Sequence, residues 1–196
     1  MKNVFLYGDS NTYGFDPAGD IFYPRYAPDK IWVNIVNKKL VGKVHIMDDG
    51  MNGRQIPSSD MEYDVFREKL RKLPEFDVFA VMLGTNDYLN MMEPDERIVA
   101  EKMGAFLTNV KFIMQDIGIN ARILLIAPPQ IKIIEDPRYD TTDGNFAKEY
   151  KKLSEELNCE FIDAGACPLA FDGVHLSEEG HKMLAELINN GFRLII

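Results

Sequence analysis

The sequence predicts an α/β fold, a three-layer αβα sandwich around five parallel strands in the flavodoxin-like order 2-1-3-4-5. Five short apolar runs recur along the chain, and segments with helical periodicity separate them. Two of these runs, at 78–83 and 123–126, contain no charged residue, which is typical of strands covered on both faces. A chain of 196 residues can bury a substantial core, so we expect a single domain over residues 1–196.

Strands and helices alternate along the chain. The expected strands are 3–8, 43–48, 77–83, 121–127 and 160–163. The expected helices are about 29–41, 60–73, 94–116 and 143–158, with a last one that starts at 177. The longest irregular stretch, 128–142, follows the fourth strand, and a loop of this length is usually functional or mobile.

Apolar residues spaced three and four apart predict the buried face of each helix. These residues are Ile31, Ile35, Val36 and Leu40 in the first helix, Val65, Phe66, Leu70 and Leu73 in the second, and Ile98, Met103, Phe106, Leu107, Val110, Phe112 and Met114 in the third. We expect Pro94 in the first turn of the third helix and Gly118 at its exit. Ser177 is a suitable N-cap for the last helix.

Composition and charge exclude several classes of function. A net charge of −9 disfavours nucleic acid and anionic membrane surfaces as partners. No apolar segment approaches the roughly 20 residues of a membrane span, and Met1 leads directly into a strand without a signal peptide, so we expect a cytoplasmic protein. Cys159 and Cys167 have no metal-binding or redox spacing, and we expect reduced thiols, although the sequence leaves a disulfide open. We expect no metal and no cofactor.

The segment Gly8–Gly14, with sequence GDSNTYG, follows the first strand. In an open α/β sheet, ligands collect at the carboxyl ends of the strands. Ser10 would therefore be presented to substrate on a rigid element. It is a candidate nucleophile, and the alternative is a turn serine that caps a helix.

Two further segments follow strands at the same edge. Asn86, in Gly84–Asp87, could donate an amide hydrogen bond to an oxyanion, although Asn in a turn is common. Asp87 would orient the loop or cap the segment that follows, without a chemical role. After the second strand, the Gly53 N–H could serve the same oxyanion. The alternative is that Gly50 and Gly53 are ordinary turn glycines. We expect Arg54 to have a solvated or a structural role, with Asp48, Asp49 or a neighbouring loop as its candidate partner.

Asp172 and His175 lie three residues apart, just before the last helix. The carboxylate can orient the imidazole, whose other nitrogen would then accept a proton from a hydroxyl. The alternative is a solvated loop histidine, or one that caps the helix. Together with Ser10, Gly53 and Asn86, the pair completes the set of groups that acyl transfer requires, all on one sheet edge. His45 and His181 have no convincing ligand spacing.

These blocks resemble the GDSL/SGNH hydrolase superfamily, and they are most similar to its arylesterase and acetylesterase branch. The resemblance implies a flavodoxin-like αβα sandwich and ester hydrolysis through an acyl-serine. It assigns Ser10 as the nucleophile, His175 as the base and Asp172 as its partner, and it places the N–H groups of Ser10 and Gly53 and the Asn86 side chain in the oxyanion hole. Asn11 stands where many relatives have leucine, which we expect to change the lining of the pocket and not the chemistry.

The expected substrate is a small carboxylic ester, acetyl or short acyl, acetylated sugars included. Thioesters and lysophospholipids stay open, as does a homo-oligomer. The residues expected to contact substrate are Asp9, Asn11, Tyr13, Tyr88, Ile131 and Val174, while Phe15, Met91 and Phe171 also adjoin the motifs. Core packing accounts for each of these pocket residues equally well. The rival functions are a flavin-binding module and a noncatalytic carbohydrate-binding or scaffold relative.

Overall fold

Five parallel strands form the central sheet of the computed structural model, which describes residues 1–133 and 145–195. The strands are β1 (Lys2–Gly8), β4 (Val44–Gly50), β5 (Val78–Met82), β6 (Arg122–Ala127) and β7 (Glu160–Asp163). Their order, β4-β1-β5-β6-β7, is 2-1-3-4-5 among the predicted strands and confirms the predicted fold class. Residues 134–142 of the expected loop lie outside the described residues.

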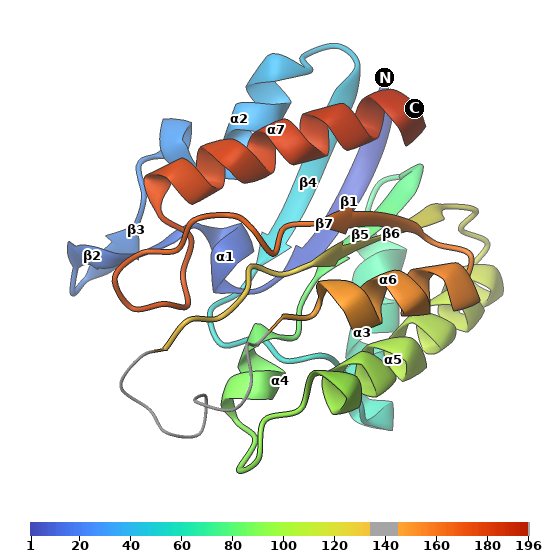
Figure 1. The fold of residues 1–196 in the computed structure, drawn as a ribbon. Coiled ribbons are helices and arrows are strands. Elements are labelled where there is room, and N and C mark those ends of the chain that lie inside the picture. The colour runs from blue at the N-terminus through green and yellow to red at the C-terminus, as the bar shows by residue number, and fades with distance from the viewer. Residues whose placement is uncertain (134–144, 196) are drawn as a thin grey trace.

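Helices cover both faces of the sheet (Figure 1). One face carries α2 (Trp32–Lys39) and α7 (Glu178–Ile195), and the other carries α3 (Asp60–Lys72), α5 (Glu96–Asp116) and α6 (Ala147–Glu156). Successive side chains of β1 alternate between the two cores. Val4 and Leu6 pack in the core under α2 and α7, and Phe5 and Tyr7 pack in the core under α3 and α5.

The ends of the helices follow the expected capping chemistry, with one correction. The Ser177 Oγ accepts a hydrogen bond from the Gly180 N–H at 3.1 Å, so Ser177 caps α7 as predicted. Pro94, expected in the first turn of α5, lies outside it. Asp95 is the N-cap because its carboxylate accepts a hydrogen bond from the Arg97 N–H at 2.8 Å, which a proline side chain cannot do.

Three apolar residues that we expected on buried helix faces are exposed. Val65 is 63% exposed in α3, and Ile98 and Phe112 are 53% and 65% exposed in α5. Each residue of a helix is rotated by about 100° from the one before it. Val99 and Val110 lie on the buried stripe of α5, and this rotation turns Ile98 and Phe112 well away from that stripe, toward solvent.

Several short elements have no counterpart in the predicted set. They are α1 (Ser10–Tyr13), the antiparallel hairpin of β2 (Phe15–Asp20) and β3 (Tyr23–Arg25), the 3-10 turn η1 (Pro28–Lys30) and α4 (Thr85–Leu89). The helical turns are too short for a periodic pattern to identify them, and β2, with the sequence FDPAGD, has no apolar run or alternation that predicts a strand. Among the described residues, no helix combines the length and apolar character that crossing a membrane requires.

Candidate active site

Ser10 is the first residue of α1, at the carboxyl edge of the sheet. Gly8 ends β1 in register with Gly50 of β4 and Met82 of β5, so the three strands end at one level. Asp9 then begins the helix, because its carboxylate accepts a hydrogen bond from the Asn11 N–H at 2.9 Å. The serine side chain is thereby held on a rigid turn directly above the end of β1.

The side chains of Ser10, His175 and Asp172 form one continuous hydrogen-bonded chain. The Ser10 Oγ lies 3.0 Å from the His175 Nε2, and the His175 Nδ1 lies 2.6 Å from the Asp172 Oδ2. Ser10 comes from α1, and the other two residues come from the segment between β7 and α7. This arrangement lets the imidazole take a proton from the hydroxyl while the carboxylate holds the opposite ring nitrogen.

The backbone around Asp172 explains how this carboxylate keeps its orientation and its charge. Its Oδ1 accepts hydrogen bonds from the backbone N–H groups of Val174, at 3.1 Å, and His175, at 3.0 Å. Burial raises the pKa of Asp172, but these bonds and the His175 side chain outweigh burial and hold it below the ordinary value. Asp172 is therefore ionised at neutral pH, as the partner of an imidazolium must be.

The intervening Gly173 has a positive φ of 68°, and a Cβ there would lie 2.1 Å from the backbone oxygen of Lys132. Only glycine fits this turn. The turn brings Asp172 close enough for its carboxylate to bond the two N–H groups that follow.

An aromatic ring covers the catalytic candidate His175 on one side. The Phe15 ring centroid lies 4.4 Å from that of His175, with 36° between the ring planes. Phe15 begins the β2–β3 hairpin, which no pattern in the sequence predicts. The sequence made Phe15 a candidate for the lining of the acyl or alcohol site, but nothing in it pairs Phe15 with a residue near the opposite end of the chain.

The two other candidate oxyanion donors, Gly53 and Asn86, are linked through Arg54. The Asn86 Nδ2 donates a hydrogen bond to the Arg54 backbone oxygen at 3.0 Å. The space in front of Gly53 is open, because a Cβ placed there would meet nothing within 4 Å. The loop after β4 and the segment after β5 are thus joined through Arg54.

Arg54 has a structural role, in keeping with the sequence-based expectation. Its side chain is buried, and its guanidinium donates to the Gly8 backbone oxygen at 2.8 Å and to the Asp49 Oδ1 at 3.0 Å. It also lies 4.1 Å from the centre of the Tyr7 ring, a cation–π contact. These contacts tie the Gly53 loop to the end of β1.

Asp87 orients the loop that follows β4, as expected. Its Oδ2 accepts a hydrogen bond from the Ile56 N–H at 3.0 Å, and its Oδ1 pairs with the Lys102 Nζ at 2.6 Å. Both carboxylate oxygens are therefore occupied by contacts that hold the site together, and neither is directed at substrate.

Most residues predicted to contact substrate are buried. Asp9, Asn11, Tyr88 and Ile131 are at most 5% exposed, and Tyr88 and Ile131 pack in the core under α5. Tyr13 and Val174 are partly exposed, and the Tyr13 ring lies 4.5 Å from the Arg25 guanidinium. Substrate contact by these residues stays a prediction.

Asp9 is a buried acid beside the nucleophile. Its side chain is fully buried, and its Oδ2 has no hydrogen-bond partner. Burial raises the pKa of Asp9 from 3.8 to about 6, against the opposing effect of the Asn11 N–H. The sequence motif contains this residue, but only the fold shows that burial disfavours its charged form.

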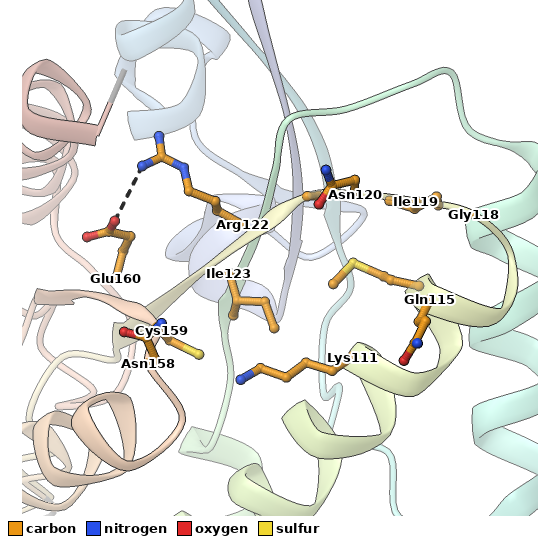
Figure 2. A pocket seen from close by; sticks show the side chains of 12 residues that line it. Lys111, Gln115, Gly118, Ile119, Asn120, Arg122, Ile123, Asn158, Cys159 and Glu160 are labelled. Carbon is orange, nitrogen blue, oxygen red and sulfur yellow. Dashed lines mark hydrogen bonds and ion pairs between the residues drawn. The ribbon is translucent and has the colours of Figure 1, made fainter.

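A cavity of about 670 Å³ lies at the opposite edge of the sheet, at the amino ends of β6 and β7 (Figure 2). The charged side chains around it have partners within the protein. Arg122 pairs with Glu160 at 3.5 Å, and Lys111 donates to the Leu157 backbone oxygen at the end of α6. Neither Ser10 nor His175 lines this cavity. It is separate from the chemistry described above.

Comparison with protein families gives a match to the GDSL-like lipase/acylhydrolase family over residues 6–183. The match extends from β1 through the segment with Asp172 and His175 into α7. Comparison with curated proteins gives no match.

Several solved structures share the fold over the whole chain. They include the carbohydrate acetylesterase Est24 from Sinorhizobium meliloti (24% identity, TM-score 0.83), a candidate arylesterase from Agrobacterium tumefaciens (25%, TM-score 0.82) and the inhibitor-bound aryl esterase of M. smegmatis (21%, TM-score 0.84). In each comparison the alignment covers 100% of both chains.

Proposed function

The chain belongs to the GDSL-like lipase/acylhydrolase family, and from that premise we propose that it is a serine esterase of small carboxylic esters. The proposed intermediate is an acyl group on the Ser10 Oγ. The observation that supports this proposal is the chain of contacts from Ser10 through His175 to Asp172, with heavy-atom distances of 3.0 and 2.6 Å. A nucleophile, a base and an orienting carboxylate are thereby within hydrogen-bond reach of one another.

In the first step, the Ser10 Oγ forms a bond to the carbonyl carbon of the ester while the His175 Nε2 takes the hydroxyl proton. The electron pair of the carbonyl bond moves to its oxygen and creates an oxyanion. When the tetrahedral intermediate collapses, the bond to the leaving alcohol breaks, and His175 gives its proton to that alcohol. The product of this half-reaction is acyl-Ser10.

Deacylation repeats the sequence with water as the nucleophile. His175 takes a proton from water as its oxygen attacks the acyl carbon, and it returns a proton to the Ser10 Oγ when the acid leaves. Asp172 stays ionised throughout, and it stabilises the imidazolium that forms in both half-reactions. The lowered pKa of Asp172 suits this role.

The oxyanion is proposed to accept hydrogen bonds from the backbone N–H groups of Ser10 and Gly53 and from the Asn86 side chain. A primary amide has two N–H donors. In Asn86 one of them bonds the Arg54 oxygen, which orients the group and leaves the second for the oxyanion. Fixed donors of this kind stabilise the transition state more than the ground state.

Labelling of Ser10 tests the proposal directly. Purified wild-type protein should hydrolyse p-nitrophenyl acetate, and a fluorophosphonate should add one label per chain, which peptide mass spectrometry should locate on Ser10. Ser10→Ala should lose both the label and the turnover, because the nucleophile is gone. Ser58→Ala, which changes an exposed serine, is the matched control and should keep both. Turnover that survives in Ser10→Ala would contradict the proposal.

The names of the structural neighbours suggest the class of substrate, an acetylated carbohydrate or an aryl ester. We therefore propose acetyl and short acyl esters as substrates. A series of p-nitrophenyl esters from acetate to octanoate, measured beside acetylated sugars, should give the highest kcat/KM for acetyl groups. A kcat/KM that rises steadily with chain length would point to a lipase or thioesterase instead.

A further inference from the structure

The Asn11 side chain links the nucleophile turn to the segment that carries His175. It is 2% exposed, and its Oδ1 accepts a hydrogen bond from the Leu176 N–H at 2.8 Å. Its Nδ2 donates to the backbone oxygen of Val174 at 3.3 Å. A single amide therefore binds the two backbone groups that flank the proposed base.

Together with Asp172, this amide completes the support of the base. The His175 N–H donates to the Asp172 Oδ1 at 3.0 Å, and the His175 backbone oxygen accepts from the Ala170 N–H at 2.7 Å. These contacts come from within the loop itself. The Asn11 contacts come from a different part of the fold, so they set where the loop lies relative to α1.

Asn11 is itself held firmly. Its N–H donates to the Asp9 carboxylate at 2.9 Å, and its backbone oxygen accepts from the Trp32 Nε1 at 3.1 Å. Asn11 follows Ser10 directly in the chain, so the position of its side-chain amide is coupled to the position of the nucleophile. The amide thus acts as a spacer of fixed length between Ser10 and the His175 backbone.

We propose that Asn11 is a positioning residue that sets the 3.0 Å separation between the Ser10 Oγ and the His175 Nε2. This inference rests on the proposed function, because the separation matters only if His175 takes the Ser10 proton. A displacement of about 1 Å in a reacting group can cost about 100-fold in rate. Asn11 does not need to touch substrate for this role, since its Oδ1 and Nδ2 both bond the backbone. This role differs from the sequence-based expectation that Asn11 changes the lining of the pocket and not the chemistry.

The chain contains a matched control for the two hydrogen bonds of the Asn11 amide. The Asn37 side chain in α2 also binds backbone on both sides of its amide, donating to the Ile46 oxygen at 3.0 Å and accepting from the Ile46 N–H at 2.7 Å. Ile46 lies within β4, away from the end where Ser10 sits. Asn37→Leu therefore removes the same kind and number of bonds without touching the proposed active site.

The test compares Asn11→Leu with Asn37→Leu, since leucine has the same number and branching of side-chain heavy atoms as asparagine but cannot form either bond. In Asn11→Leu, kcat for p-nitrophenyl acetate should fall by about 10- to 100-fold, with KM within about twofold of wild type. The rate at which a fluorophosphonate labels Ser10 should fall by the same factor. In Asn37→Leu both rates should stay within about twofold of wild type, even if its melting temperature falls as much as that of Asn11→Leu.

Equal losses of kcat in the two leucine variants would overturn the inference, because they would reflect general loosening. A raised KM with unchanged kcat would also overturn it and would make Asn11 a substrate contact. Should Asn11→Leu not fold, Asn11→Ala is measured against Asn37→Ala by the same criteria. Failure of the proposed function looks different, because wild-type protein would then show no label on Ser10.

Discussion

At the scale of single residues, Asn86 of α4 shows how hydrogen bonds to the backbone fix the orientation of a side-chain amide. Its amide donates to the Arg54 backbone oxygen at 3.0 Å, and Arg54 is in turn bonded to the Gly8 oxygen and to Asp49. Since the Arg54 side chain is buried, its bond to the Gly8 oxygen is shielded from water and holds the backbone to which the amide is bonded. A donor that is already oriented needs no reorganisation when charge develops on the substrate.

Asn86→Ala should therefore lower kcat by about 100- to 1,000-fold while KM changes little, because the lost hydrogen bond strengthens in the transition state. Asn90→Ala is the control, at the residue that caps the C-terminus of the short helix α4. The Asn90 Nδ2 donates to the Asn86 backbone oxygen at 2.8 Å, so this variant loses an amide near the site without losing the donor itself. Steady-state kinetics with p-nitrophenyl acetate distinguish the two. A kcat loss below tenfold in Asn86→Ala would contradict the role of this donor.

At the scale of elements, α1 can carry Ser10 to the sheet edge only because β4 ends in glycine. A Cβ on Gly50 would lie 2.4 Å from the Tyr13 nitrogen and 2.8 Å from the Thr12 carbonyl carbon. Both are backbone atoms, which cannot rotate out of the way as a flexible side chain could. The sequence-based expectation was that Gly50 serves the turn, but it is the last residue of β4, and its role is to admit the helix.

Gly50→Ala should push α1 away from β4. The expected loss of stability is about 1–3 kcal/mol, the usual cost of overpacking, and kcat should fall because Ser10 moves with the helix. Gly42→Ala is the control, since its φ of 77° strains an alanine by about 1 kcal/mol or more although nothing lies within 4 Å of the added Cβ. Urea unfolding and kcat measured on both variants should show similar destabilisation with loss of activity only in Gly50→Ala.

At the scale of the whole molecule, two buried groups make stability depend on pH in opposite directions. Burial raises the pKa of Asp9 to about 6 from an ordinary value of 3.8. Stability from this group is therefore fully present below pH 3.8 and is lost as pH rises through about 6. Burial lowers the pKa of His181 to about 4 from 6.5, so its contribution is full above pH 6.5 and is lost as pH falls through about 4.

His181 owes its burial to the packing of α7 on α2. It is 1% exposed, its Nδ1 accepts from the Trp32 N–H at 3.4 Å, and the Tyr26 ring meets its edge at a centroid distance of 5.2 Å. Protonation would remove that acceptor and leave a charge in an apolar core. Acid therefore weakens the contact between these two helices.

Single substitutions should separate the two contributions. Relative to wild type, Asp9→Asn should gain stability as pH rises from 4 to 7, and His181→Gln should gain stability as pH falls from 7 to 4. Each difference should approach about 3 kcal/mol, from 1.36 kcal/mol per pKa unit. Urea unfolding at several pH values measures both. Curves that run parallel to wild type across this range would contradict the assignment of these two groups.

Much of the fold could be predicted because it depends on local patterns. Uncharged apolar runs identify β5 and β6, and the alternation of strands with helices leads to a parallel sheet in the observed order. The sequence was less informative where several faces of a helix carry apolar residues. Val65, Ile98 and Phe112 satisfied an apolar pattern and are nevertheless exposed, since the pattern does not say which stripe meets the sheet.

In the candidate site too, some features could be predicted from the sequence and others could not. Ser10, Asp172, His175 and Asn86 could be selected from the sequence because each follows a strand or precedes a helix at the edge where the strands end. The partners of Asn11 could not be predicted, because they are backbone groups of Val174 and Leu176, and the side chains of these residues do not indicate which backbone groups are bonded. The Phe15 ring against His175 belongs to a hairpin whose first strand, FDPAGD, carries no apolar alternation that would predict it.

The sequence by itself determined the chemical groups that are available and the order in which the strands carry them to one edge. Only the tertiary structure decided that Ser10 and His175, 165 positions apart, have their reacting atoms at 3.0 Å, and that Asn11 ties the two segments together. The physical reason is that patterns along the chain report propensity and burial, which are local. A distance between remote side chains depends on how every intervening strand and helix packs.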